Sequence, residues 1–255
     1  MADLYIDALA TSVRSRPRLR PSAELPPRSM RRLMANMIAR DRGVPAERVH
    51  VREPVPGDPA DAADYGTTRR ALDALGRPDD DQPLFVVRSG PVADPMTSPL
   101  AGTVHAVGWT GDDVGVTHLR EHGGTQVFRL LTWAIPEDLG ATVVIVDDPA
   151  FVAVEAEKPA FAAVAVRVAR TGALRVVAAG EDLPGAEAAA RDARVFSGTG
   201  ACDAWLDLYA ALSSGAVEPG EHVLLRTVGD ERQGRLLLEA VRPRELRTSS
   251  APIGE

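Results

Sequence analysis

One order of elements occurs twice in this chain, and it constrains the fold more than any single motif. The first copy reads GGTQVFRLLTWAIPEDLGATVVIVDDP followed by FAAVAVRVAR, and the second reads ACDAWLDLYAALSSGAVEPGEHVLLRTVGD followed by RQGRLLLEAV. Each copy predicts a helix, a loop with glycine, a buried apolar strand, an aspartate turn and a second strand. The turns at Asp147-Asp148 and Gly229-Asp230 mark matching points. The repetition predicts a duplicated α/β architecture.

Further elements continue the α/β pattern on the N-terminal side of these copies. Apolar periodicity predicts a strand at Leu4–Ala10, a helix at Ser29–Arg40, a helix at Tyr65–Leu75 and a strand at Leu84–Arg88. Proline, aspartate and alanine over residues 51–63 predict a loop. A helix, an acidic turn and an apolar strand together make one more α/β unit.

Three finer expectations concern packing and pairing. On the first helix, an apolar face predicts core residues at Met30, Leu33, Met34 and Met37. The segment Thr103–Trp109 predicts a strand. The alternating segments Phe161–Ala169 and Ala173–Ala178 predict an antiparallel pair, because only Arg170-Thr171-Gly172 separates them.

The charge balance and the cysteine count exclude several classes of function. The 255 residues carry a formal charge of −7, and no apolar run reaches the length that crosses a bilayer. We therefore expect a cytoplasmic protein that binds neither nucleic acid nor membrane, and we expect no cofactor. The single cysteine, Cys202, excludes an internal disulfide. Because the adjacent Asp203 raises the pKa of its thiol, we predict a small buried residue rather than a nucleophile.

A family resemblance is carried by three segments: Tyr65–Gly90, residues 103–148 and Cys202–Glu239. Together they resemble the ketosynthase III branch of the thiolase superfamily, which condenses acyl chains carried on coenzyme A or acyl carrier protein. The resemblance implies a thiolase-like, duplicated α-β-α-β-α layered sandwich with mixed sheets. At 255 residues the chain is shorter than a typical member. We therefore expect a single domain with an N-terminal half over 1–150 and a shortened C-terminal half over 151–255.

The nucleophile position departs from the family pattern. In condensing enzymes a cysteine begins the central helix, where the helix N-terminus lowers the pKa of the thiol. Aligning Gly123-Gly124 with the small residues after that cysteine places Glu121 at its position and His122 beside it. No histidine lies between His122 and His222, and Ser197-Gly198-Thr199 stands where the family often has Gly-Asn-Thr. The resemblance implies that Glu121 and His122 are inactive equivalents of catalytic residues and that condensation is lost.

The segment GVTHLREHGG also fits a different chemistry. His118, Glu121 and His122 form H-x-x-E-H, in which two histidines bind zinc and the glutamate polarises a water in inverted zincin proteases. A third zinc ligand would be Glu181 or Glu187. The two glycines that follow favour a turn into a helix over a helix that runs through the motif. A zinc-dependent or acyl-thioester hydrolase that uses these residues is the alternative function.

The leading expectation is a non-condensing, ketosynthase-like subunit of polyketide or fatty-acyl biosynthesis. Like a chain-length factor, it would pair with a full-length, active ketosynthase as a heterodimer, or else form a homodimer. The predicted strand Thr103–Trp109 is the expected edge of that dimer. A second expected partner is an acyl carrier protein, bound through the arginines near Arg28–Arg40.

Overall fold

The computed structural model of the chain describes residues 3–14, 18–63, 65–92, 98–117, 119–136, 139–153, 161–183, 185–229 and 232–251. The helices of this part are α1 Met30–Asp41, α2 Pro59–Ala62, α3 Gly66–Leu75, α4 Pro99–Val107, α5 Gly123–Ala134, α6 Glu187–Asp192 and α7 Asp203–Ser213. None of the helices in these ranges is long and apolar enough to span a membrane.

The described residues form two sheets. The larger has 10 strands: β1 Tyr5–Arg14, β4 Leu84–Arg88, β5 Asp113–Val116, β6 Ala141–Asp147, β8 Phe161–Ala169, β9 Leu174–Gly180, β10 Arg194–Gly198, β11 His222–Val228, β12 Gln233–Ala240 and β13 Arg247–Ser250. The smaller has three: β2 Arg18–Pro21, β3 Val49–Glu53 and β7 Phe151–Ala153.

The strand order confirms the duplication. The large sheet runs β10-β11-β12-β9-β1-β8-β6-β4-β5. In its first half, β4 and β6 are parallel, β6 and β8 are antiparallel, and β8 and β1 are antiparallel. In its second half, β10 and β11 are parallel, β11 and β12 are antiparallel, and β12 and β9 are antiparallel. The two halves therefore repeat one topology.

The second half is the shorter one. In the first half, the chain between β4 and α5 forms α4 and β5, and β5 pairs with β4 in parallel. In the second half, β10 ends at Gly198 and α7 begins at Asp203. Only residues 199–202 lie between them, so the described second half has no equivalent of α4 and β5, and β10 ends its side of the sheet.

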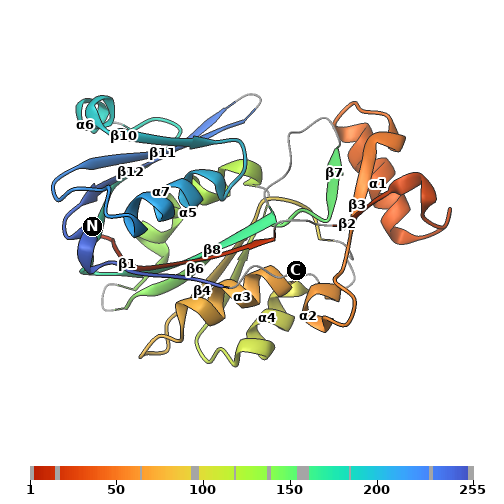
Figure 1. Cartoon of the computed structure of the whole chain (residues 1–255), viewed down its shortest axis with the longest axis horizontal. Coiled ribbons are helices and arrows are strands. Elements are labelled where there is room, and N and C mark those ends of the chain that lie inside the picture. The colour runs from red at the N-terminus through yellow and green to blue at the C-terminus, as the bar shows by residue number, and fades with distance from the viewer. Residues whose placement is uncertain are drawn as a thin grey trace.

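The elements form five layers, as the duplicated sandwich requires (Figure 1). Helices α3 and α4 cover the outer face of the first half, α5 and α7 lie between the halves, and α6 covers β11 on the outside. Strand β6 contributes Val143 and Ile145 to the inner core and Val144 and Val146 to the outer one. Burial on both faces explains its continuous apolar run.

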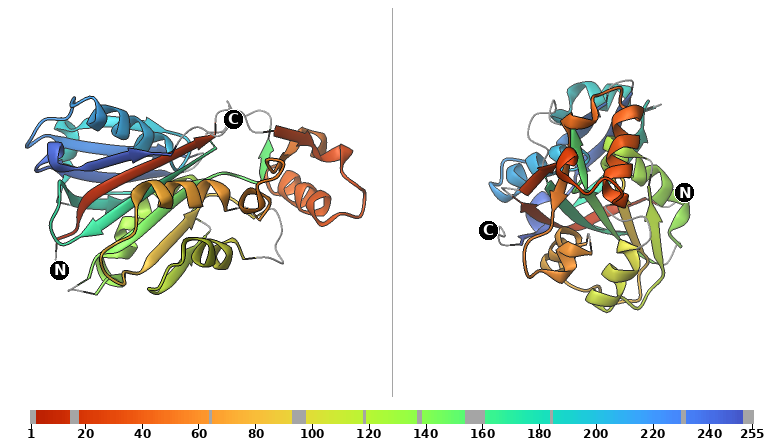
Figure 2. Two further views of the ribbon diagram at one scale, coloured as in Figure 1. Left: turned by 60° about the horizontal axis from the view of Figure 1, so that its bottom comes forward. Right: turned by 90° about the vertical axis from the view of Figure 1, so that its right-hand side faces the viewer.

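A smaller unit projects from the end of this sandwich, and we call it the α1 lobe: residues 18–53 and β7. Figure 2 shows α1 and the three-stranded sheet standing apart from the five layers. The lobe has a small core of its own, in which Ala35 and Ala39 of α1 pack against Val49, Val51 and Phe151.

The predicted core face of α1 is wrong for three of its four residues, and only Met34 is half-buried and packs against the core of the lobe. Met30, Leu33 and Met37 are 49%, 48% and 70% exposed. The helix instead buries its alanine face, because small side chains let it approach the thin sheet closely. Periodicity located the helix, which Ser29 caps by accepting a hydrogen bond from the Arg32 amide, but both of its long faces are apolar enough to be the inner one.

The segment Thr103–Trp109 is not a strand, which corrects a second prediction. It lies in and just after α4, which Ser98 caps by accepting a hydrogen bond from the Ala101 amide. Pro99 stands in the first turn, and Gly108 ends the helix with φ +59°. These capping residues outweigh the β-branched composition of the segment. The edge strand of the first half is β5 instead.

Strands β8 and β9 do form where they were predicted, but they do not pair with each other. The first strand, β1, lies between them, with Tyr5 opposite both Ala169 and Arg175. Gly172 permits this insertion, because a Cβ there would lie 2.8 Å from the Ile6 carbonyl oxygen. The predicted loop 51–63 likewise contains the end of β3 and the short helix α2, which Asp58 caps.

Candidate functional site

The two central helices, α5 and α7, start beside each other. Trp205 Nε1 donates a hydrogen bond to the Gly124 carbonyl oxygen at 2.7 Å, and its ring stacks on Phe128 with centroids 5.5 Å apart. A Cβ at Gly124 would lie 2.0 Å from the Ala201 carbonyl oxygen, so only glycine allows this approach. Both positive helix ends therefore meet at the centre of the sandwich.

A short 3-10 helix, η3 Arg120–His122, leads into α5 and carries the predicted site residues. His122 occupies the N-cap position of α5, and its Nε2 lies 3.4 Å from Glu121 Oε1. The imidazole is 11% exposed and the glutamate side chain 28%. Arg120 has φ +48°, a left-handed conformation that is strained for a residue with a Cβ. The structure thus brings Glu121 and His122 together at a helix N-terminus.

Two glycines of the second half cover this pair. A Cβ at Gly229, after β11, would lie 2.1 Å from Glu121 Oε1 and 2.9 Å from His122 Nε2. A Cβ at Gly234, in β12, would lie 2.2 Å from Thr125 Oγ1 and 3.1 Å from His122 Nδ1. The sequence marks Gly229 only as part of a repeated turn and does not mark Gly234, although a glycine inside a strand pattern often indicates a close approach.

In the described part of the H-x-x-E-H motif, Glu121 and His122 belong to the 3-10 helix η3. His118 lies outside the described residues, and its neighbours Thr117 and Leu119 are not helical. Among the residues placed in the structure, no group of three or more histidine, cysteine, aspartate or glutamate side chains is arranged to hold a metal ion. Glu187 belongs to the outermost helix, α6. Glu181 pairs with Arg232 at 3.3 Å.

Two carboxylates, Asp147 and Asp203, accept hydrogen bonds from the backbone at the N-terminus of α7. The repeated aspartate turn in the sequence indicates only Asp147. Asp147, at the end of β6, accepts a hydrogen bond from Ser89 Oγ at 2.8 Å and others from the Ala201 and Cys202 amides. Asp203 accepts from the amides of Thr199 at 3.1 Å and Gly200 at 2.7 Å. Burial, the largest cause, and the charge of Asp203 together raise the pKa of Asp147 to about 6, against the lowering effect of its hydrogen bonds from Ser89 and the two amides.

Cys202 is a buried structural residue, as the sequence predicts. Its thiol is fully buried and points at the carbonyl oxygens of Ile145 and Ala162, at 3.4 and 3.7 Å. Burial, and then the charges of Asp147 and Asp203, raise its pKa well above the ordinary value for a thiol. In the duplicated topology, Cys202 caps α7 as His122 caps α5.

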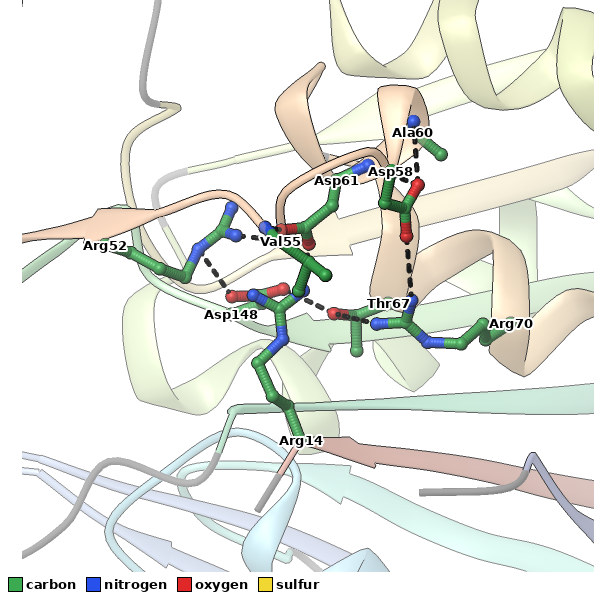
Figure 3. A network of polar contacts seen from close by, with 9 residues as sticks. All are labelled: Arg14, Arg52, Val55, Asp58, Ala60, Asp61, Thr67, Arg70 and Asp148. Carbon is green, nitrogen blue, oxygen red and sulfur yellow. Dashed lines mark hydrogen bonds and ion pairs between the residues drawn. The ribbon is translucent and has the colours of Figure 1, made fainter. Parts of the chain in front are cut away.

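A second polar cluster, away from these helices, joins the α1 lobe to the sandwich (Figure 3). Arg52 of β3 pairs with Asp61 at 3.3 Å and with Asp148 at 2.9 Å, and Arg14 at the end of β1 also pairs with Asp61. Thr67 Oγ1 donates to Asp148. All four charged side chains are at most 6% exposed. Because its two arginines and two aspartates are buried and neutralise one another, the cluster is an anchor rather than a reaction site.

Comparison with known proteins identifies the fold alone. No family model and no curated protein matches the sequence. Among solved structures, ChlB3, described as an acyltransferase, is 13% identical, with 96% of this chain and 99% of that chain covered and a TM-score of 0.58. A single-residue variant of Xanthomonas campestris OleA is 11% identical, with coverages of 93% and 98% and a TM-score of 0.53. A 3-hydroxy-3-methylglutaryl-CoA (HMG-CoA) synthase complexed with CoA is 9% identical, with coverages of 97% and 88% and a TM-score of 0.56. The chain shares the thiolase-like fold of these proteins.

Proposed function

We propose that this thiolase-like chain is a non-condensing, ketosynthase-like subunit that pairs with an active ketosynthase in polyketide or fatty-acyl biosynthesis. The proposal rests on which residues stand at the N-terminus of α5. Glu121, which aligning Gly123-Gly124 with the family's small residues assigns to the position of the reactive thiol, is paired with His122 and covered by Gly229 and Gly234. Solved structures of similar fold include an acyltransferase and an HMG-CoA synthase, which agrees with this setting.

The carboxylate of Glu121 cannot replace a thiolate in acyl transfer. A helix N-terminus stabilises its charge, and that stabilisation lowers its reactivity as a nucleophile. The one thiol of the chain, at Cys202, is buried with a raised pKa and is equally unsuited. Both positions at which a central helix begins therefore lack an acyl acceptor.

The second half supports the same proposal. Condensing relatives use a histidine and an asparagine, or two histidines, from their C-terminal half to decarboxylate the extender unit. In this chain Gly198, the last residue of β10, stands where the family often has its asparagine, and only residues 199–202 join β10 to α7. The missing α4–β5 equivalent removes much of the backbone that would carry such groups.

The proposed dimer contact is the free edge of β5, which replaces the rejected segment Thr103–Trp109. Strand β5 pairs only with β4 in the described part of the chain, and Val114 on it is 38% exposed. An exposed edge strand presents unpaired amides and carbonyls to a neighbouring chain. A heterodimer with a full-length ketosynthase is proposed, and a homodimer would use the same edge.

Co-expression with a ketosynthase encoded beside this gene tests the proposal. We expect a 1:1 complex that survives Glu121→Ala and is lost in Val114→Lys, because lysine on an edge strand opposes pairing. The matched control is Val195→Lys, on the free edge strand β10, where valine is 46% exposed. A complex that tolerates Val114→Lys contradicts the β5 contact, and no complex with any ketosynthase contradicts the partnership.

One observation favours a second function, acyl-thioester hydrolysis. His122 Nε2 lies 3.4 Å from Glu121 Oε1, slightly longer than the hydrogen bond between a general base and its orienting carboxylate, a contact that often tightens only when substrate binds. Within the described residues His122 Nδ1 is buried and has no hydrogen-bond partner, so this ring nitrogen is not engaged by another protein group. Turnover of acyl-CoA by the isolated chain, lost in both His122→Ala and Glu121→Ala, would establish the hydrolase. Stoichiometric zinc in protein purified without chelator would identify its zinc-dependent form.

A further inference from the structure

The outward side of α1 carries an apolar stripe with an arginine at its end, and we call it the α1 face: Met30, Leu33, Met37 and Arg40. These residues follow each other at spacings of three and four, so they lie along one side of the helix. All four are exposed, and Met37 at 70% is among the most exposed apolar residues of the chain. A stripe that does not pack on its own lobe is available to another molecule.

The charge of the α1 lobe indicates that this molecule is acidic. Residues 18–53 contain nine arginines and four acidic residues, a formal charge of +5 in a chain whose total is −7. Arg28, Arg40 and Arg42 are exposed. Arg32 is not available, because its Nη1 donates to the carbonyl oxygens of Ala23 and Leu25 at 3.2 and 2.9 Å. The lobe is thus a basic surface on an otherwise acidic protein.

The side-chain types favour a protein over a lipid surface. Methionine is flexible and polarisable, and it adapts to the apolar face of a partner helix. A membrane-binding helix usually adds aromatic residues, and α1 has none. A flat anionic bilayer would also meet the acidic sandwich beside the lobe, whereas a small domain on α1 would not.

The C-terminal end of α1 approaches the short helix that leads into the candidate site. Asp41, the last residue of α1, has Oδ2 at 3.8 Å from Arg120 Nη2, and Arg120 directly precedes Glu121. A domain seated on α1 would therefore stand near the N-terminus of α5. This position suits a partner that carries a bound acyl group to the N-terminus of α5.

We propose that the α1 face docks a small acidic carrier domain, with Met30, Leu33 and Met37 against its apolar patch and Arg40 against its carboxylates. This inference rests on the proposed function, which supplies the acyl-chain setting. It assigns to this chain the task of holding the carrier beside the paired ketosynthase. Charge steers the encounter and the methionines provide the buried contact.

Titration of the full chain with purified holo acyl carrier proteins from the same genome tests the docking. We expect binding at 50 mM salt that weakens at least about tenfold at 300 mM, because the arginine contacts are screened. Met37→Glu and Arg40→Glu should each weaken it about tenfold or more. Matched controls are Val195→Glu on β10 and Arg244→Glu, both exposed and remote from the lobe in sequence. Controls should change the dissociation constant less than about twofold.

Three results would overturn the docking surface: no carrier bound at low salt, binding that Met37→Glu leaves unchanged, or an α1 face that instead binds phosphatidylglycerol vesicles or a second copy. Sedimentation of the chain with such vesicles and by itself separates the last two. The outcome is distinct from the ketosynthase test, because a chain that binds the carrier but no ketosynthase keeps this surface and loses the partnership.

Discussion

Trp205 of α7 donates its indole hydrogen to the carbonyl oxygen of Gly124 in α5 at 2.7 Å, which ties the two halves of the fold at their shared centre. The bond requires a residue without a Cβ at position 124, because the Ala201 carbonyl fills the space. Helices α5 and α7 are therefore held together by this hydrogen bond, by the close approach at Gly124 and by the stacking of Trp205 on Phe128.

Gly124→Ala should destabilise the fold by about 1–3 kcal/mol, because a Cβ 2.0 Å from a backbone oxygen forces the helices apart. Gly90→Ala is the matched control, since its Cβ would meet Pro149 at an ordinary 3.5 Å. Chemical denaturation followed by tryptophan fluorescence measures both. Equal stability of the two variants would contradict the close packing of α5 and α7.

The stability should fall as the pH rises from about 4 to about 6, through Asp147. Its pKa is raised from 3.8 to about 6 in the folded chain, so the folded state binds more protons than the unfolded state in this window. Deprotonation then costs at most about 3 kcal/mol. Asp147→Asn should flatten the dependence of the unfolding free energy on pH, while the exposed Asp73→Asn should not. An unchanged slope in Asp147→Asn contradicts the assignment.

The thiol of Cys202 should react with a maleimide only when the chain unfolds. It is fully buried, and its raised pKa leaves almost no thiolate near neutral pH. The labelling rate should therefore rise with denaturant in step with unfolding. Fast labelling of the native chain, measured by mass spectrometry, would show that the centre of the sandwich opens readily.

Arg14→Met should destabilise the chain by about 3–5 kcal/mol, because it leaves Asp61 with one guanidinium instead of two in a buried cluster. The control is Arg69→Met, whose i,i+4 pair with Asp73 is about half exposed and should cost less than about 0.5 kcal/mol. Hydrogen exchange should also show faster exchange in β3 of the Arg14 variant. If Arg14→Met lowers the free energy of unfolding by less than about 1 kcal/mol, the buried ion pairs of this cluster do not anchor the lobe.

The duplication could be predicted from the sequence because each repeated unit is local. The helix at Gly123–Ile135 and the strand at Thr142–Val146 each depend on a single run of side chains, and α5 and β6 appear there. Local rules failed where capping competed with composition, as in α4, and where two helix faces were both apolar, as in α1. In both cases tertiary packing or end signals decided the outcome.

The closest contacts of the candidate site could not be predicted, because they join distant residues. Gly229 and Gly234 approach Glu121 and His122 only after the second half folds over α5. The pairing of Arg14 with Asp61 likewise depends on the order of strands. The insertion of β1 between β8 and β9 is the clearest case, since two adjacent alternating segments otherwise favour a hairpin.

The inserted β1 also sets when folding can finish. Strand β1 pairs with β8 and β9 and, in parallel, with β13, and Asp7 bonds to Arg247, 240 residues away in sequence. A chain leaving the ribosome therefore exposes its first strand with no sheet neighbour until β8, at residues 161–169, has been synthesised, and the parallel neighbour β13 follows only near the end of the chain. Contacts of such long range slow folding and leave an apolar strand unprotected. Rapid translation or a holding chaperone would favour recovery of the native protein, and separately expressed halves would aggregate.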